Sequence, residues 1–239
     1  MGRIHLSGVV IIVGNYGSGK TEVAVNLAVD QKRRGLNVRV ADLDLVNPYF
    51  RTREARQALK SEGIEVILPP DRLLQADLPI LMPQIAGLIG DPGDLAILDV
   101  GGDDVGATVL AALQQAFMPL KGKLTMLQVV NPYRPGTGSV EGCLSMRKAI
   151  EASARMTVNR WVGNAHMLDE TSAEHFRFGL DFMASLQNES HLDVEFITAP
   201  HDLLPLLERE QLMWPVLPIY RQLVPPWKKP AGFAAGTKS

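Results

Sequence analysis

One short stretch, residues 9–24 (VVIIVGNYGSGKTEVA), constrains the fold of this chain more than any other. It matches the phosphate-binding pattern G-x-x-x-x-G-K-[ST] at every fixed position, from Gly14 to Thr21. An apolar run precedes the pattern and a helical pattern follows it, which is the context that the pattern requires. Loop glycines let backbone N–H groups turn inward around phosphate oxygens, and the helix N-terminus adds positive potential there. The stretch therefore predicts a phosphate-binding loop (the P-loop, residues 14–21) and not a chance Gly-rich turn.

The residues of the P-loop have distinct predicted roles. Lys20 is expected to reach the outer phosphates and to act in catalysis, and the Thr21 hydroxyl is expected to bind Mg²⁺. We expect the loop and the first helical turn to surround the nucleotide, through Gly14, Asn15, Tyr16, Gly17, Ser18, Gly19, Lys20, Thr21 and Glu22.

Strand-like apolar runs alternate with helical patterns along nearly the whole chain. Strands are predicted at 9–13, 38–42, 64–68, 95–99, 124–130, 159–163 and 194–198. Helices are predicted at 21–34, 52–61, 80–89, 105–117, 140–154 and 202–209, and from a capping box at 171–174 to about 187. Within 80–89, Pro83 is expected only near the helix start.

Continuous apolar strands separated by helices are typical of a parallel sheet covered on both faces. The chain has 239 residues, 46% of them apolar, which is enough for one sizeable core. We predict one α/β nucleotide-binding domain over residues 1–224, a three-layer sandwich with a mostly parallel central sheet and helices on both faces. The proline-rich residues 225–239 are expected to form a flexible tail.

Acidic residues end two of the predicted strands. Asp42 and Asp44 lie on the same side of an extended chain, so one could orient water while the other joins the Mg²⁺ shell. Alternatively, they hold the backbone of the following loop. After the strand 95–99, Asp99 is expected to support Mg²⁺, and the glycines that follow, Gly102 in particular, let backbone N–H groups approach a γ-phosphate.

The residues after a late predicted strand bear on which base the nucleotide carries. A GTP-specific protein would normally carry N-K-x-D after a late strand, whereas this chain has Gly-Asn-Ala-His-Met at 163–167. The sequence therefore favours ATP, with Asn164 as a contact to the adenine amino group and Pro200 flanking the ring. The alternative is that Asn164 simply ends a strand.

Composition argues against several other classes of protein. The net charge of −2 gives no global attraction to nucleic acid, and Cys143, the only cysteine, cannot form an internal disulfide. The five histidines show no metal-ligand spacing, so Mg²⁺ brought by a nucleotide is the only metal expected. No signal peptide and no apolar stretch of membrane-spanning length is found, so we expect a cytoplasmic protein without membrane binding.

Taken in order, these motifs resemble those of the MinD/ParA-like P-loop ATPases of the CobQ/CobB/MinD/ParA nucleotide-binding family. The resemblance covers most of residues 8–220 and depends on the segments VGNYGSGKT, ADLDLVNP, LAILDVGG, VVNPYRPGT and VGNAHML. It implies that Thr21 and Asp99 hold Mg²⁺, that Asp44 positions the attacking water and that Asn164 contacts adenine. It also implies a nucleotide-bridged homodimer.

One position departs from that family. Its loops typically read K-G-G-x-G-K-[ST], whose first lysine reaches the partner's phosphates, and here Asn15 and Tyr16 replace that lysine and the following glycine. A cation at the γ-phosphate contributes on the order of 10³–10⁵ to the rate in related reactions. We therefore expect slow intrinsic turnover, with Arg51, Arg53 and Arg134 as candidate replacements or as ordinary surface arginines.

Three functions fit these observations. The first is an Mg²⁺-dependent ATPase that acts as a nucleotide-driven switch on a partner protein. The second is a small-molecule kinase or ligase like dethiobiotin synthetase, with a substrate pocket at Tyr49, Arg51, Arg53, Tyr133 and Arg134. The third is a module that binds ATP with negligible turnover.

Overall fold

The computed structural model describes residues 2–44, 55–67, 78–102, 104–120, 122–207, 212–225 and 227–233. Its strands are β1 (Gly8–Gly14), β2 (Val38–Leu43), β3 (Glu65–Ile67), β4 (Leu95–Val100), β5 (Leu124–Val130), β6 (Arg160–Gly163), β7 (Val194–Pro200) and β8 (Val216–Ile219). Its α-helices are α1 (Lys20–Arg33), α2 (Arg56–Ser61), α3 (Leu78–Gly90), α4 (Asp104–Ala112), α5 (Gln114–Phe117), α6 (Val140–Ala154), α7 (Ala173–Ser190) and α8 (Leu204–Leu207). Two short 3₁₀ helices, η1 (Leu168–Glu170) and η2 (His201–Leu203), complete the described elements.

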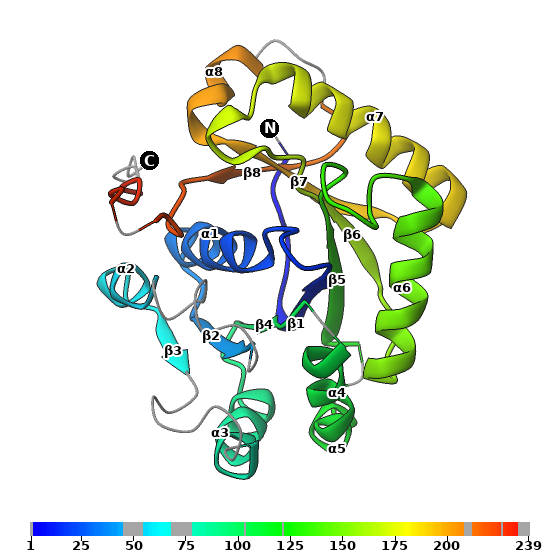
Figure 1. Cartoon of the computed structure of the whole chain (residues 1–239). Coiled ribbons are helices and arrows are strands. Elements are labelled where there is room, and N and C mark those ends of the chain that lie inside the picture. The colour runs from blue at the N-terminus through cyan, green and yellow to red at the C-terminus, as the bar shows by residue number, and fades with distance from the viewer. Residues whose placement is uncertain are drawn as a thin grey trace.

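The strands form one eight-stranded sheet in the order β3-β2-β4-β1-β5-β6-β7-β8. Every neighbouring pair is parallel. All carboxyl ends therefore meet at one edge of the sheet, where ligands bind in folds of this kind. β1, which leads into the P-loop, lies in the middle of the sheet (Figure 1).

Alternate side chains of β1 point to opposite faces of the sheet and are buried in different core clusters. Val10 and Ile12 of β1 pack with α1 in one core cluster, whereas Val9, Ile11 and Val13 pack with residues of α3 and α4 in another. A third cluster joins α7 to β6 and β7. Figure 1 shows α1 and α2 on one side of the sheet and α3 to α6 on the other. The predicted three-layer α/β sandwich with a parallel sheet is confirmed.

Three local features differ from the predictions. Pro83 lies inside α3, where its exposed ring removes one backbone donor without ending the helix. The helix predicted at 105–117 is divided at Leu113 into α4 and α5. The capping box begins at Ser172, and His175 is its other member: Ser172 Oγ accepts the His175 N–H and His175 Nδ1 accepts the Ser172 N–H.

The strand β8 was not predicted from the sequence. Pro215 and Pro218 interrupt its apolar run, which reads as a loop. Because β8 lies at the edge of the sheet beside β7, it needs hydrogen-bond partners on one side only, and an edge strand tolerates proline.

The described residues after β8, 220–225 and 227–233, form a segment that we call the C-terminal strap. It runs beside α1 (Figure 1), and the Phe233 ring packs on the α1 side of the core with Arg33 above it, 5.8 Å from the ring centroid. The strap thus lies against the domain as far as Phe233, while the boundary predicted at residue 225 stays a prediction. Among the described helices, none is long and apolar enough to cross a membrane.

Candidate nucleotide-binding site

A cavity of about 590 Å³ opens at the carboxyl edge of the sheet, within the size range of small-molecule sites. Three parts of the chain line it. They are the P-loop with α1, the strand ends with their following loops, and the C-terminal strap. The lining residues are Tyr16, Gly17, Gly19–Glu22, Asp44, Gly102, Arg134, Asn164–His166, Leu168, Asp169, Thr171, Thr198, Pro200–Asp202, Ile219, Arg221, Leu223, Pro225 and Ala231.

The P-loop has the backbone shape of an anion cradle. Gly17 and Gly19 have φ angles of 72° and 89°, which favour glycine. Gly19 is the N-cap of α1, and no side chain among the described residues caps this helix end. The first-turn N–H groups of α1 therefore stay available to a phosphate, together with the positive end of the helix dipole.

Lys20 and Gly102 approach the same point of the loop. The Lys20 ammonium is buried and donates to the Asn15 carbonyl oxygen at 3.0 Å. A β-carbon at Gly102 would lie 2.6 Å from Lys20 Nζ and 2.9 Å from the Tyr16 nitrogen. Only glycine fits there without a shift of its neighbours, so the backbone after β4 comes close to the place where a γ-phosphate would bind. The predicted contact of Gly102 with that phosphate stays a prediction.

Carboxylates lie near the carboxyl ends of β2 and β4. Asp42 and Asp99 occupy paired positions on the neighbouring strands β2 and β4, and both are buried. Asp42 Oδ1 accepts the Asp44 N–H at 2.9 Å, while Asp44 itself lines the cavity. Carboxylate and hydroxyl oxygens are ligands that Mg²⁺ prefers. Asp99, Asp42 and Thr21 are donors of the type that suits Mg²⁺ bound with a nucleotide, and the expected roles of Thr21 and Asp99 at Mg²⁺ and of Asp44 in orienting water stay predictions.

No group of three or more His, Cys, Asp or Glu residues that could hold a metal is found in the described parts of the chain. The buried Cys143 thiol donates to the Thr137 carbonyl oxygen, and burial raises its pKa to about 12. It is thus an unreactive packing residue.

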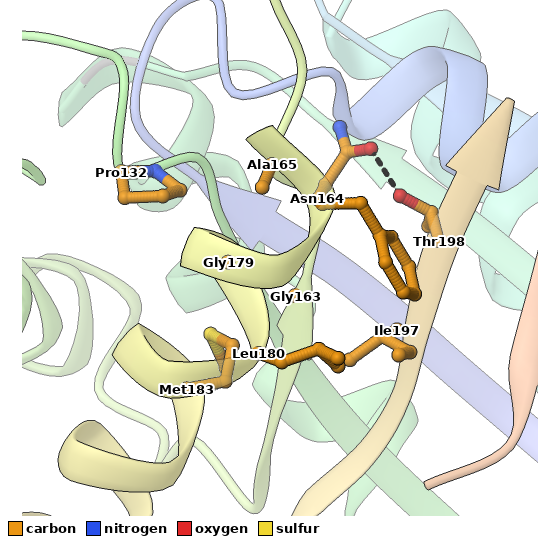
Figure 2. Close-up of a pocket in the computed structure, with 10 residues that line it drawn as sticks. Pro132, Gly163, Asn164, Ala165, Gly179, Leu180, Met183, Ile197 and Thr198 are labelled. Atoms are coloured by element: carbon orange, nitrogen blue, oxygen red, sulfur yellow. Dashed lines mark hydrogen bonds between the residues drawn. The ribbon is translucent and has the colours of Figure 1, made fainter. Parts of the chain in front are cut away.

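Asn164 lines the cavity with its amide already engaged within the chain. Its Nδ2 donates to the Ser18 carbonyl oxygen at 2.6 Å, and its Oδ1 accepts the Thr198 hydroxyl at 2.5 Å. Figure 2 shows this second bond, with Asn164 in the loop that follows β6 and Thr198 on β7. Through these two bonds Asn164 connects the P-loop backbone to β7. The contact of Asn164 with a base, like that of Pro200, stays a prediction.

A second, much smaller pocket lies beside Asn164, between β6, β7 and α7 (Figure 2). Its volume is about 10 Å³, barely enough for one water molecule. It is a gap in the packing, too small for a ligand.

His166, which was not predicted to belong to the site, lies two residues after Asn164 and close to Gly19 of the P-loop. A β-carbon at Gly19 would lie 3.1 Å from His166 Nε2. Burial, followed by the positive charges of Arg134 and Arg221, lowers the pKa of His166 to about 4. The ring is therefore neutral at physiological pH, and because Nδ1 accepts the Leu168 N–H, the proton belongs on Nε2. An isolated histidine carries no sequence signal for this position.

Sequence reasoning also missed the C-terminal strap as a wall of the cavity. Glu22 lines the cavity and accepts the Gln222 and Leu223 N–H groups at 2.7 and 3.0 Å, and its predicted contact with the nucleotide stays a prediction. Burial raises the pKa of Glu22, against the effect of these hydrogen bonds. Nearby, Asp169 pairs with Arg221 at 2.5 Å and with Lys228. The strap is thus fastened on both sides of the cavity.

Asn15 is hydrogen-bonded to the loop that follows β5. Its Nδ2 donates to the Pro135 carbonyl oxygen at 2.7 Å, and its Oδ1 accepts the Tyr16 N–H. In the same loop, the Arg134 Nε donates to the Gly17 carbonyl oxygen at 3.0 Å. Of the residues proposed for a kinase substrate pocket, Tyr133 packs on His175 and Phe178, whereas Tyr49, Arg51 and Arg53 lie outside the described residues.

No protein-family profile matches this sequence, and no curated protein sequence matches it either. Similar solved structures include the cell division protein FtsY of Thermotoga maritima, 19% identical over 83% of this chain and 65% of that one, with a TM-score of 0.57. The signal recognition particle receptor FtsY of Elizabethkingia anophelis in complex with GDP is 18% identical over 83% and 59%, with a TM-score of 0.55. The signal recognition particle 54 kDa protein of Aeropyrum pernix K1 in complex with GDP is 18% identical over 82% and 42%, with a TM-score of 0.54.

At this identity the similarity shows a shared fold, and this chain spans less than two thirds of the length of each of these neighbours. The neighbours correct two expectations. The expected membership of the MinD/ParA-like ATPase family is wrong, because the similar structures are signal recognition particle and receptor proteins. The P-loop is common to many nucleotide-binding families. In this chain Asn15 stands where the MinD/ParA-like family has its signature lysine, and Asn15 donates to the Pro135 carbonyl oxygen of its own chain.

The expectation of ATP as the bound nucleotide is also wrong, since two of these neighbours hold GDP. The expectation depended on a missing N-K-x-D pattern. Carboxylates outside that pattern can still lie at the cavity. Asp169 and Asp202, which the pattern does not include, both line it. A short pattern cannot exclude residues that the fold brings together.

Proposed function

We propose that this protein binds a guanine nucleoside triphosphate with Mg²⁺ and hydrolyses it slowly, and that the nucleotide state sets its contact with a partner protein. The observation that carries the proposal is the cavity that the P-loop, Lys20, Asp44 after β2 and Gly102 after β4 line together, with Asp42 and Asp99 buried at paired positions of β2 and β4. The GDP complexes of proteins with this fold support the choice of base.

In the proposed reaction, the N–H groups of the P-loop and Lys20 hold the phosphates, and Thr21 with Asp99 and Asp42 holds Mg²⁺. When bound there, the ion would neutralise charge on the terminal phosphates. Asp44 orients the attacking water. Because the loop after β4 lies against Lys20 and Tyr16, loss of the γ-phosphate removes a contact from that loop, which is the physical basis for a switch.

Fluorescent GDP and GTP analogues, titrated into the purified protein with Mg²⁺, test the proposal. We expect saturable binding that Lys20→Ala weakens at least about 100-fold, because the loop loses its only ammonium. Phosphate release from GTP, followed in the same samples, tests hydrolysis. ATP serves as the competitor. Displacement of the GDP analogue by ATP as efficiently as by GTP would contradict the choice of guanine, and equal binding by Lys20→Ala would contradict the site.

A further inference from the structure

We infer that Arg134 binds the terminal phosphate within the same chain and stabilises the negative charge that develops as this phosphate is transferred to water. The inference rests on the proposed function and adds a cation that the P-loop motif does not contain. Of the three candidate arginines, Arg134 is the one within the described residues, and it lies at the P-loop.

Arg134 lies directly on the P-loop. Its Nε donates to the Gly17 carbonyl oxygen at 3.0 Å, across 117 residues of sequence. A β-carbon at Gly17 would lie 3.5 Å from Arg134 Nε and 3.9 Å from the guanidinium carbon. Gly17 has a φ of 72° and lies between the loop's first glycine and Lys20. The guanidinium therefore stands beside the loop that holds the phosphates, and it lines the same cavity as Lys20.

The loop that carries Arg134 is held in place by hydrogen bonds on both sides. Asn15 of the P-loop donates to the Pro135 carbonyl oxygen. Asn131, fully buried, accepts the Tyr133 N–H and donates to the His166 carbonyl oxygen, and the Thr137 hydroxyl donates to the Asn131 carbonyl oxygen at 2.8 Å. A cation on so fixed a loop needs little reorganisation when charge develops, which is the condition for electrostatic catalysis.

The charge of Arg134 is available to a ligand. Within the described residues Arg134 makes no ion pair, whereas Arg221, on the other side of the cavity, pairs with Asp169. The Nε–H bond to Gly17 uses one of the five donors of a guanidinium. Arg134 also helps to lower the pKa of the cavity residue His166, so its positive field reaches into the cavity.

The chemistry needs no proton from Arg134. The oxygen of water forms a bond to the γ-phosphorus while the bond from that phosphorus to the β,γ-bridging oxygen breaks, and the bonding pair leaves with the diphosphate. The protons of the water pass to the released phosphate and to solvent. The remaining N–H groups of Arg134 donate to the γ-phosphate oxygens and to the bridging oxygen as negative charge builds there. An arginine in this role raises kcat by about 10³-fold or more.

The test compares Arg134→Ala and Arg134→Lys with the unchanged protein, using GTP, GDP, and GDP with aluminium fluoride, which imitates the transferring phosphate. We expect Arg134→Ala to bind GDP within about threefold of the parent and to lose about 100-fold or more in single-turnover hydrolysis. Its affinity for GDP with aluminium fluoride should fall in parallel. Added guanidinium chloride at millimolar concentration should restore part of the rate, which a purely structural role would not produce. Arg134→Lys keeps the charge but loses the forked geometry, so we expect an intermediate rate.

Arg160→Ala is the matched control, because it removes an exposed arginine, paired with Glu195, at the start of β6 and away from the cavity. Hydrolysis by Arg134→Ala at the parent rate, with unchanged aluminium fluoride affinity, would overturn the inference while leaving the proposed function standing. Equal losses of GDP affinity and rate would also overturn it, since Arg134 would then hold the P-loop only. Absence of any guanine nucleotide binding by the parent would overturn both proposals.

Discussion

Asp42 and Asp44 lie two residues apart at the end of β2, but their surroundings differ. Asp42 is fully buried beside Asp99, and its carboxylate accepts the Asp44 N–H. Asp44 is half-buried and lines the cavity. The strand spacing alone leaves open which of the two orients water, whereas the family resemblance implied Asp44. Asp44 is the one of the two that lines the cavity, so we propose it for that role and Asp42 for the Mg²⁺ shell.

We predict that Asp44→Asn lowers the rate of GTP hydrolysis about 10²- to 10⁴-fold and leaves GDP affinity within about threefold, because a neutral amide accepts no proton from water. Single-turnover phosphate release and GDP titration measure the two effects. Asp181→Asn, on an exposed position of α7, is the control. A comparable rate in Asp44→Asn would remove this residue from its role.

His166 makes stability depend on pH. Its pKa is about 4 in the folded protein and 6.5 ordinarily, so between these values the unfolded chain binds a proton that the folded protein does not. The free energy of unfolding therefore falls as pH is lowered from about 6.5 towards 4, by at most about 1.4 kcal/mol per pH unit from this residue.

Urea unfolding at pH 7.0, 6.0 and 5.0 measures this effect. We expect His166→Gln to lose stability less steeply than the parent over that range, because glutamine does not titrate. His5→Gln, at an exposed position near the N-terminus, should keep the parent's slope. Equal slopes in the parent and in His166→Gln would show that His166 is not buried as a neutral ring.

At the scale of elements, side chains of α1 hold the C-terminal strap through hydrogen bonds. Glu22 accepts two strap N–H groups, and Asn26, one turn later, accepts the Tyr220 N–H at 2.8 Å. Glu22 directly follows Thr21, the Mg²⁺ ligand expected in the P-loop. The strap is therefore bonded to α1 next to that ligand.

We predict that Glu22→Ala lowers the free energy of unfolding by about 2–4 kcal/mol, because the Gln222 and Leu223 N–H groups lose their acceptor. Hydrogen exchange at these two amides should become faster than in the parent. Glu22→Gln keeps an acceptor oxygen and should lose less. Glu174→Ala, exposed in the first turn of α7, should cost less than about 1 kcal/mol. A loss in Glu22→Ala no larger than this control would contradict the fastening role.

The elements themselves were predictable where periodicity is strong. The strands 124–130 and the helix 140–154 appear with the predicted bounds, since each is a continuous local pattern. β8 and the division at Leu113 were not predictable. β8 forms through its long-range pairing with β7, which local propensity does not contain, and after the division Gln114 donates to the Arg155 carbonyl oxygen beyond α6.

At the scale of the whole molecule, the cavity joins parts from both ends of the chain. Residues of the P-loop and the first turn of α1 form one wall, and residues of the loops after β6 and β7 also line the cavity. The opposite contribution comes from Ile219, Arg221, Leu223, Pro225 and Ala231. A ligand that fills this cavity binds the folded protein only, so it must stabilise the fold as a whole.

We predict that Mg²⁺-GDP at 100 times its dissociation constant raises the free energy of unfolding by about 2.7 kcal/mol. Thermal and urea unfolding with and without the nucleotide measure this. Lys20→Ala at the same GDP concentration should gain much less. A nucleotide that binds the parent without changing its stability would have to bind the unfolded chain equally well, which contradicts a site built by the fold.

By itself, the sequence determined the α/β fold, the P-loop and the acidic strand ends, because each depends on residues within a few positions of one another. Tertiary structure alone decided which distant side chains complete the site. Arg134 reaches Gly17 across 117 residues, Asn164 reaches Ser18 across 146, and the strap reaches Glu22 across 200. These contacts depend on the order of strands in the sheet and on the path of the chain after β8. A single sequence read in local windows contains neither.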